Sequence, residues 1–137
     1  MRKLSTAFLM ILILAACSRG GYKEPKERPR TPEELQLGKR AFELSNQISA
    51  FRQDAPPELS SSLSGLAETG ERFSNSSQRF GAGSLEARDA FDKLRYHSVQ
   101  LNSLITKDKF PDLFDRWQGI QTEIKDISIK LGYRPEK

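Results

Sequence analysis

The chain has 137 residues, a formal net charge of +4, one histidine and one cysteine. This length is typical of a single compact domain. One cysteine permits neither a disulfide within the chain nor a C-x-x-C-H haem attachment, and one histidine is too few for a zinc site. The residue three positions before His97 is Leu94, so the E-x-x-H motif of di-iron bundles is missing as well. We therefore expect no metal and no cofactor.

The first sixteen residues have the organisation of an export signal. Arg2 and Lys3 precede an uncharged run over residues 4–16, which ends in the small residues Ala15 and Ala16. As a helix this run would rise about 20 Å, which is short of the roughly 30 Å of hydrocarbon in a bilayer. The pattern predicts a cleaved signal peptide, residues 1–16, rather than a membrane-spanning helix.

The end of this run, Leu14-Ala15-Ala16-Cys17, resembles the lipobox of bacterial lipoproteins. The resemblance implies a diacylglyceryl thioether on the sulfur of Cys17, cleavage between Ala16 and Cys17, and often a third acyl chain on the freed amine. Two or three acyl chains would hold the protein firmly on a membrane. Ser18 in the next position implies the outer membrane, facing the periplasm, under the sorting rule of enteric bacteria. The alternative is an ordinary secretory signal with a chance cysteine.

Residues 17–31 are expected to form a flexible basic tether behind the lipidated cysteine. Five basic and two acidic residues lie in 18–30, together with two glycines and two prolines, and Tyr22 is almost the only apolar residue. Such a segment does not form a core. Its charge favours either contact with anionic headgroups or a solvated spacer. Residues 31–137 have a net charge of −1. No expected helix has a basic face, and we expect no nucleic-acid partner.

The first two expected helices cover about 32–53 and 57–80. Thr31-Pro32-Glu33-Glu34 is a capping-box start signal, and the Pro56-Pro57 pair separates the helices. Residues at alternating spacings of three and four form one apolar seam on each helix. The second helix contains many serines and glycines, so the sequence predicts that it is the least protected element. The two seams are Leu37, Ala41, Leu44, Ile48 and Phe51, then Leu59, Leu63, Leu66, Gly70, Phe73, Ser77 and Phe80.

Two further helices are expected over about 85–105 and 110–131. Ser84 and Asp108 are placed to cap their starts, and Gly132 is placed to end the last one, with Tyr133 folding back on it. Short connections between four amphipathic helices predict an all-α, up-down-up-down four-helix bundle over 32–137. Proline and glycine breaks disfavour the alternative, an intermolecular coiled coil. The seams are Ala87, Phe91, Leu94, Ser98, Leu101 and Ile105, then Leu113, Trp117, Ile120, Ile124, Ile127 and Leu131.

Catalytic groups are scarce in these helices. His97 is the only conventional general base for neutral pH, and the residues beside it in the sequence point in other directions on a helix. Carboxylates at helical spacing, in Glu68 with Arg72 and in Asp89 with Lys93, are expected to form surface ion pairs. We therefore expect no enzymatic activity.

Two binding functions remain open. The preferred one is a non-enzymatic accessory lipoprotein whose helical domain binds another envelope protein, in the manner of a pilotin or an assembly factor. The alternative is a carrier of a small apolar ligand, held in a cavity at the low-volume positions Gly70, Ser77 and Ser98. The candidates for ligand or partner contact all suit core positions as well; they are Phe73, Phe80, Phe91, His97 and Trp117.

The chain ends in Lys137, and a terminal lysine joins the major murein lipoprotein to peptidoglycan. The tail here carries Pro135-Glu136 before that lysine instead of a Tyr-Arg-Lys ending. We expect a frayed polar terminus rather than attachment through Lys137.

Overall fold

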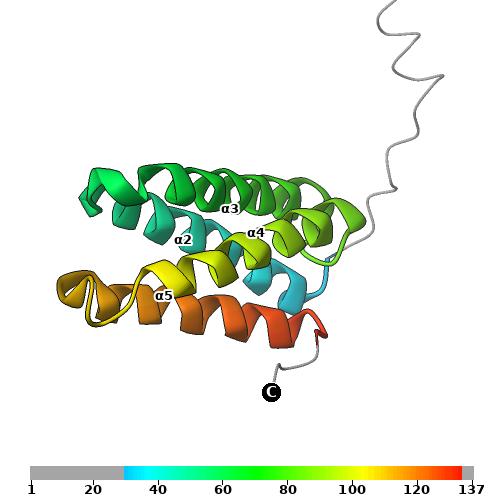
Figure 1. The fold of residues 1–137 in the computed structure, drawn as a ribbon. Helices are drawn as coiled ribbons and strands as arrows, with labels where there is room; N and C mark the ends of the chain where they lie inside the picture. The colour runs from blue at the N-terminus through cyan, green and yellow to red at the C-terminus, as the bar shows by residue number, and fades with distance from the viewer. Residues whose placement is uncertain (1–29, 134–137) are drawn as a thin grey trace, which may run out of the picture.

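The computed structural model describes residues 30–133. Within this range the chain forms four α-helices and one short 3-10 helix, with no strand (Figure 1). The all-α class with four helices is therefore confirmed. The signal peptide, Cys17, most of the expected tether and Lys137 lie outside the described residues. The elements are α2 (Pro32–Asp54), η1 (Pro57–Leu59), α3 (Ser60–Phe80), α4 (Leu85–Leu104) and α5 (Pro111–Lys130).

The helix ends follow local side-chain chemistry at three of the expected places. Thr31 Oγ1 accepts from the amide of Glu34 while Glu34 Oε1 accepts from the amide of Thr31, which is a complete capping box. Ser84 Oγ accepts from the amide of Ala87 at the start of α4. Gly132 has φ +93°, and the amide of Tyr133 donates to the carbonyl of Ser128, so α5 ends in a Schellman motif.

Two expected helix starts are wrong in detail. Asp108 does not cap the last helix, because the hydroxyl of Thr106 accepts from the amide of Lys109 in the preceding turn. Helix α5 begins at Pro111 and has no side-chain cap. The second expected helix begins as a 3-10 turn at Pro57 and becomes α-helical only at Ser60.

Helix α3 packs closely against both α2 and α4, whereas α5 packs against α2. The buried seam residues of all four helices form one core, from Leu37 and Ala41 on α2 to Ile127 on α5. The backbones of α4 and α5 do not come comparably close to each other along their length. Side chains at their ends join them instead, because the indole of Trp117 donates to Asn102 and the guanidinium of Arg88 donates to the carbonyl of Leu131.

The start of α2, the α3–α4 loop and the end of α5 lie at one end of the bundle, which we call the proximal end (Figure 1). Arg30 fixes this arrangement, because its guanidinium donates to the carbonyls of Gln78 and Arg79 near the end of α3. The described chain therefore begins at the proximal end. Among the helices within residues 30–133, none has both the length and the apolar character required to cross a bilayer.

Candidate binding surfaces

The aromatic residues expected at a contact site lie in separate parts of the core. Trp117 is fully buried, stacks at 5.8 Å from Phe51, and donates through Nε1 to Asn102 Oδ1 at 2.8 Å. Phe73 and Phe91 form a second pair with ring centroids 4.8 Å apart. These pairs hold the helices together and do not line a common site. Phe80 is half-buried, with the guanidinium of Arg79 5.1 Å from its ring.

His97 packs against the backbone of the neighbouring helix. A Cβ placed on Gly65 of α3 would lie 2.6 Å from His97 Cε1, so the ring occupies the space that the glycine leaves. The ring of Tyr96 meets the imidazole edge-on, 5.6 Å away. The imidazole is thus half-buried at the α3–α4 interface, where its contacts are those of a packing residue.

The low-volume positions do not gather around one interior space. At Gly70, the Cδ1 atoms of Ile48 and Leu94 approach within 3.2 and 3.6 Å of where a Cβ would lie. Ser77 is buried, and its hydroxyl has no hydrogen-bond partner. Ser98 lies on another side of the bundle, where its hydroxyl donates to the carbonyl of Arg95.

Ser98 belongs to an open groove between α4 and α5, which we call the α4–α5 groove. The groove encloses about 520 Å³. Its floor is formed by buried side chains of Ser98, Ile124 and Ser128. Large apolar side chains stand on its rims, with Val99 on α4 65% exposed and Ile129 on α5 48% exposed. The other lining residues are Asp92, Arg95, Tyr96, Asn102, Gln121 and Lys125.

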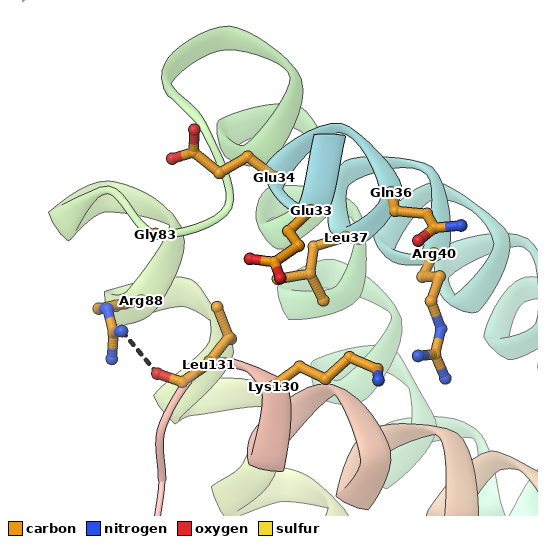
Figure 2. Close-up of a pocket in the computed structure, with 9 residues that line it drawn as sticks. All are labelled: Glu33, Glu34, Gln36, Leu37, Arg40, Gly83, Arg88, Lys130 and Leu131. Atoms are coloured by element: carbon orange, nitrogen blue, oxygen red, sulfur yellow. Dashed lines mark hydrogen bonds between the residues drawn. The ribbon is translucent and has the colours of Figure 1, made fainter. Parts of the chain in front are cut away.

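A second recess of about 540 Å³ lies at the proximal end, between the starts of α2 and α4 and the end of α5. Figure 2 shows Glu33 and Glu34 of α2 on one side and Arg88 with Lys130 on the other. Arg88 donates to the carbonyl of Leu131 at 2.6 Å, and Glu34 belongs to the capping box. Arg88 thus joins α4 to the end of α5, and Glu34 caps α2, so the groups of this recess already serve the fold and we assign no ligand to it.

Ion pairs join α2 to α5 along their shared side. Arg40 donates to Glu123 Oε2 at 2.8 Å and to Asp126 Oδ2 at 2.7 Å. The bond to Glu123 raises the pKa of the Arg40 guanidinium above its ordinary value, and the bond from Arg40 lowers the pKa of the Asp126 carboxyl. At the other end of the same interface Arg116 pairs with Asp54 at 2.9 Å.

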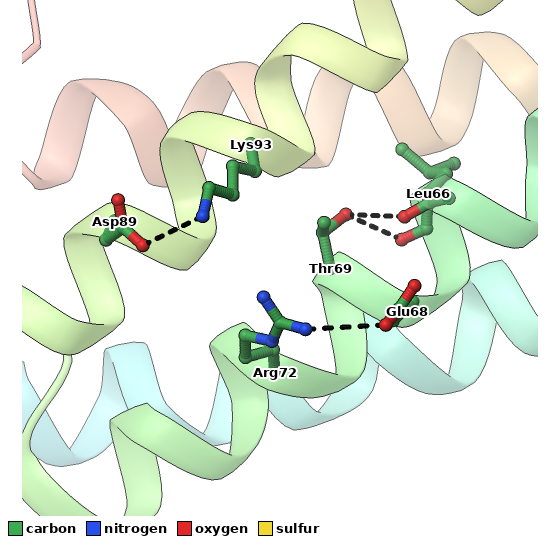
Figure 3. Close-up of polar contacts among 7 residues, drawn as sticks. Leu66, Glu68, Thr69, Arg72, Asp89 and Lys93 are labelled. Atoms are coloured by element: carbon green, nitrogen blue, oxygen red, sulfur yellow. Dashed lines mark hydrogen bonds and ion pairs between the residues drawn. The ribbon is translucent and has the colours of Figure 1, made fainter.

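The surface pairs expected on α3 and α4 are confirmed (Figure 3). Arg72 and Glu68 lie 3.4 Å apart, and Lys93 and Asp89 lie 3.3 Å apart. In the same view the hydroxyl of Thr69 donates back to carbonyls of its own helix. These carboxylates therefore lie on a solvated face of the bundle.

Of the groove residues, only Ser98 was singled out from the sequence, as a low-volume position, and none was among the predicted contact residues. The available signal was the presence of apolar side chains off the helix seams, at Tyr96, Val99 and Ile129. Leu35 and Phe42 on α2 carry the same signal and are 59% and 54% exposed. Across residues 30–133 no three histidine, cysteine or acidic side chains gather as metal ligands.

No protein-family model, curated protein or solved structure matches this chain. The functional conclusion therefore depends on the residues and the surfaces described above.

Proposed function

We propose that this protein is a lipid-anchored, non-enzymatic binding module of the bacterial cell envelope. It is held on the outer membrane, facing the periplasm, by acyl chains on Cys17, and it binds a helix of a protein in the same envelope. The observation that carries the proposal is the lipobox-like sequence Leu14-Ala15-Ala16-Cys17, followed by a short basic segment and a helical domain.

The α4–α5 groove supports the choice of a helix as the bound element. It runs from Asp92 to Asn102 on α4 and from Gln121 to Ile129 on α5. Ten residues of helix correspond to about 15 Å, which is close to three turns. Short side chains on the floor leave room for large side chains of a partner, and apolar rims favour an amphipathic helix. Such a helix would bury Val99 and Ile129.

The polar groups of the groove favour binding over catalysis, because several already serve the fold. Asn102 accepts from Trp117, Asp92 accepts from the hydroxyl of Tyr133, and Ser98 donates to the main chain. No comparable observation supports the small-ligand carrier, since the space at Gly70 is filled by Ile48 and Leu94.

The anchor is tested on the mature protein purified from membranes. We expect an intact mass that begins at Cys17 and includes a diacylglyceryl group, with incorporation of an alkyne analogue of palmitate. Cys17→Ser should abolish both. Residues 18–137 behind an ordinary cleavable signal should then leave the membrane fraction. Retention of that chain at low salt and its release at about 1 M salt would assign attachment to the basic segment instead.

The groove is tested with two charge insertions at exposed apolar positions. Val99→Glu places a carboxylate on the groove rim, whereas Leu85→Glu places one at a site that is 82% exposed and outside the groove. Cross-linking in whole cells should lose its protein adducts with Val99→Glu and keep them with Leu85→Glu. Equal loss in both variants would argue against the groove as the binding surface.

A further inference from the structure

An exposed apolar ridge lies on the outer face of α2. Leu35 and Phe42 are seven residues apart, so they stand two helical turns apart on one face. The buried side chains of Leu44 and Phe51 lie on the opposite face of α2. We call Leu35 and Phe42 the α2 ridge. Two large apolar side chains in line on an exposed helix are the anchors that a helix-binding groove accepts.

The ridge and the α4–α5 groove cannot meet within one copy. Helix α2 contacts α3 and α5 closely, and its ridge points away from the core, whereas the groove opens between α4 and α5. The α2 ridge and the α4–α5 groove are therefore two apolar surfaces, one protruding and one recessed, on different sides of the same molecule. Contact between them requires two copies.

The two surfaces stand at the same level above the proximal end. Arg40 of α2 pairs with Glu123 and Asp126 of α5, which fixes the relative height of these helices. Phe42 lies two residues beyond Arg40, about 3 Å along the axis, and is therefore within one turn of Ile124 on the groove floor. Two copies with parallel axes and their proximal ends toward one membrane would place Phe42 of one copy opposite the middle of the other copy's groove.

Charge and attachment favour the same arrangement. Glu43 follows Arg40 by three residues and lies on the same side of α2. When the two copies have the same orientation, that side of α2 is turned toward the α5 rim of the receiving copy, which carries Lys125.

The described chain begins at the proximal end, after a segment of thirteen residues, 18–30, that can reach up to about 45 Å from the anchor. Lipid anchors would thus confine all copies to one layer beside the membrane, which raises their effective concentration.

We propose that the helix bound by the α4–α5 groove is α2 of a second copy of this chain. This inference rests on the proposed function of the groove as a helix-binding surface. Each copy that receives a ridge still has its own ridge exposed, and each copy that donates one still has an open groove. The contact is head-to-tail and extends into rows in the plane of the membrane.

The test joins two differently marked copies of the full lipoprotein on one membrane. One copy carries Phe42→Cys and the other carries Val99→Cys, with different epitope tags. Because Cys17 is the only natural cysteine and is acylated in the mature protein, a short bismaleimide links only the introduced thiols. We expect a dimer that contains both tags. The matched control is Lys109→Cys, an exposed position in the α4–α5 loop, paired with Val99→Cys; it should give no dimer.

Two charge insertions complete the test. In a second pair of copies, one copy carries Leu35→Cys and the other carries Ile129→Cys. Adding Phe42→Glu to the Leu35→Cys copy should lower the fraction of cross-linked dimer at least about tenfold. Adding Leu85→Glu instead should leave that fraction unchanged. Equal linking through Lys109→Cys, or linking only between two Phe42→Cys copies, would overturn the head-to-tail contact. Loss of other protein adducts with Val99→Glu, together with no link between copies, would reject this inference and leave the proposed function standing.

Discussion

The close approach of α3 and α4 at Gly65 can be tested by adding one methyl group. In Gly65→Ala the new Cβ would lie 2.6 Å from Cε1 and 2.9 Å from Nδ1 of His97. Alanine in a helix is favoured over glycine by about 0.8–1 kcal/mol, whereas overpacking costs about 1–3 kcal/mol. We expect the single variant to be less stable than the wild type by up to about 2 kcal/mol. For a domain of this size each kcal/mol lowers Tm by roughly 4–8 °C.

The decisive comparison adds His97→Ala. Without the imidazole the new methyl group meets no ring, so Gly65→Ala should stabilise the His97→Ala protein by about 1 kcal/mol. The two substitutions should then be non-additive by about 1–3 kcal/mol. Urea unfolding followed by the fluorescence of Trp117, the only tryptophan, measures all four proteins. Gly119→Ala is the control, because nothing beyond its chain neighbours and the backbone of its own helix lies within 4 Å of its Cβ position. Identical effects of Gly65→Ala in both backgrounds would refute the close contact.

Three further predictions follow from the packing. Arg40 lowers the pKa of the Asp126 carboxyl. Their pair therefore stabilises the fold above the unfolded carboxyl pKa of about 4, and this contribution is lost as the pH falls through the lowered pKa. Asp126→Asn should narrow the difference in the free energy of unfolding between pH 7 and pH 3, and an unchanged difference would contradict this. Asn102→Ala should cost about 1–2 kcal/mol in urea unfolding, because the buried indole of Trp117 loses its acceptor, and Asn102→Asp should cost less. Backbone amides should exchange hydrogen faster in α5 than in α3, because α3 packs closely on two helices. If α5 instead exchanged most slowly, the result would favour the sequence-based expectation that α3 is the least protected helix.

The sequence predicts the helices well because their signals are local. The capping box at Thr31 and the left-handed residue at Gly132 are set by chemistry within one turn, and both are present. The expected cap at Asp108 fails for an equally local reason, since Thr106 already caps the preceding turn and Pro111 supplies the first helical residue. Choosing between neighbouring polar residues in a short loop requires the loop backbone, which helix periodicity does not define.

The candidate binding surfaces were harder to predict because they depend on distances between helices. Seam spacing identifies Trp117 and Phe91 as inward-facing, and both are fully buried. The same spacing cannot show that α3 and α4 lie close together while α4 and α5 lie apart. Val99 is an off-seam residue in the sequence, and it becomes a groove rim only because α5 stands away from it. Contacts far apart in the chain thus decide which exposed apolar residues share a surface.

Aromatic contacts between α4 and the α5 segment lie at each end of the groove. Far from the proximal end, the indole of Trp117 reaches across to Asn102. At the proximal end, Tyr133 packs 5.7 Å from Phe91. Between these bulky groups the floor carries the short side chain of Ser128. The groove is therefore the gap between these two aromatic contacts, which the short side chains of its floor leave unfilled.

This account predicts opposite effects of Ser128→Leu on folding and on binding. A leucine at this position would extend into the groove, cover Ile124 and bury its own apolar surface. We expect the free energy of unfolding to stay constant or to rise by up to about 1 kcal/mol. The same side chain would occupy the place of Phe42 from a second copy, so cross-linking between Leu35→Cys and Ile129→Cys copies should fall. A loss of more than about 2 kcal/mol would instead place Ser128 in a filled core, and an unchanged cross-link would show that the ridge does not enter the groove.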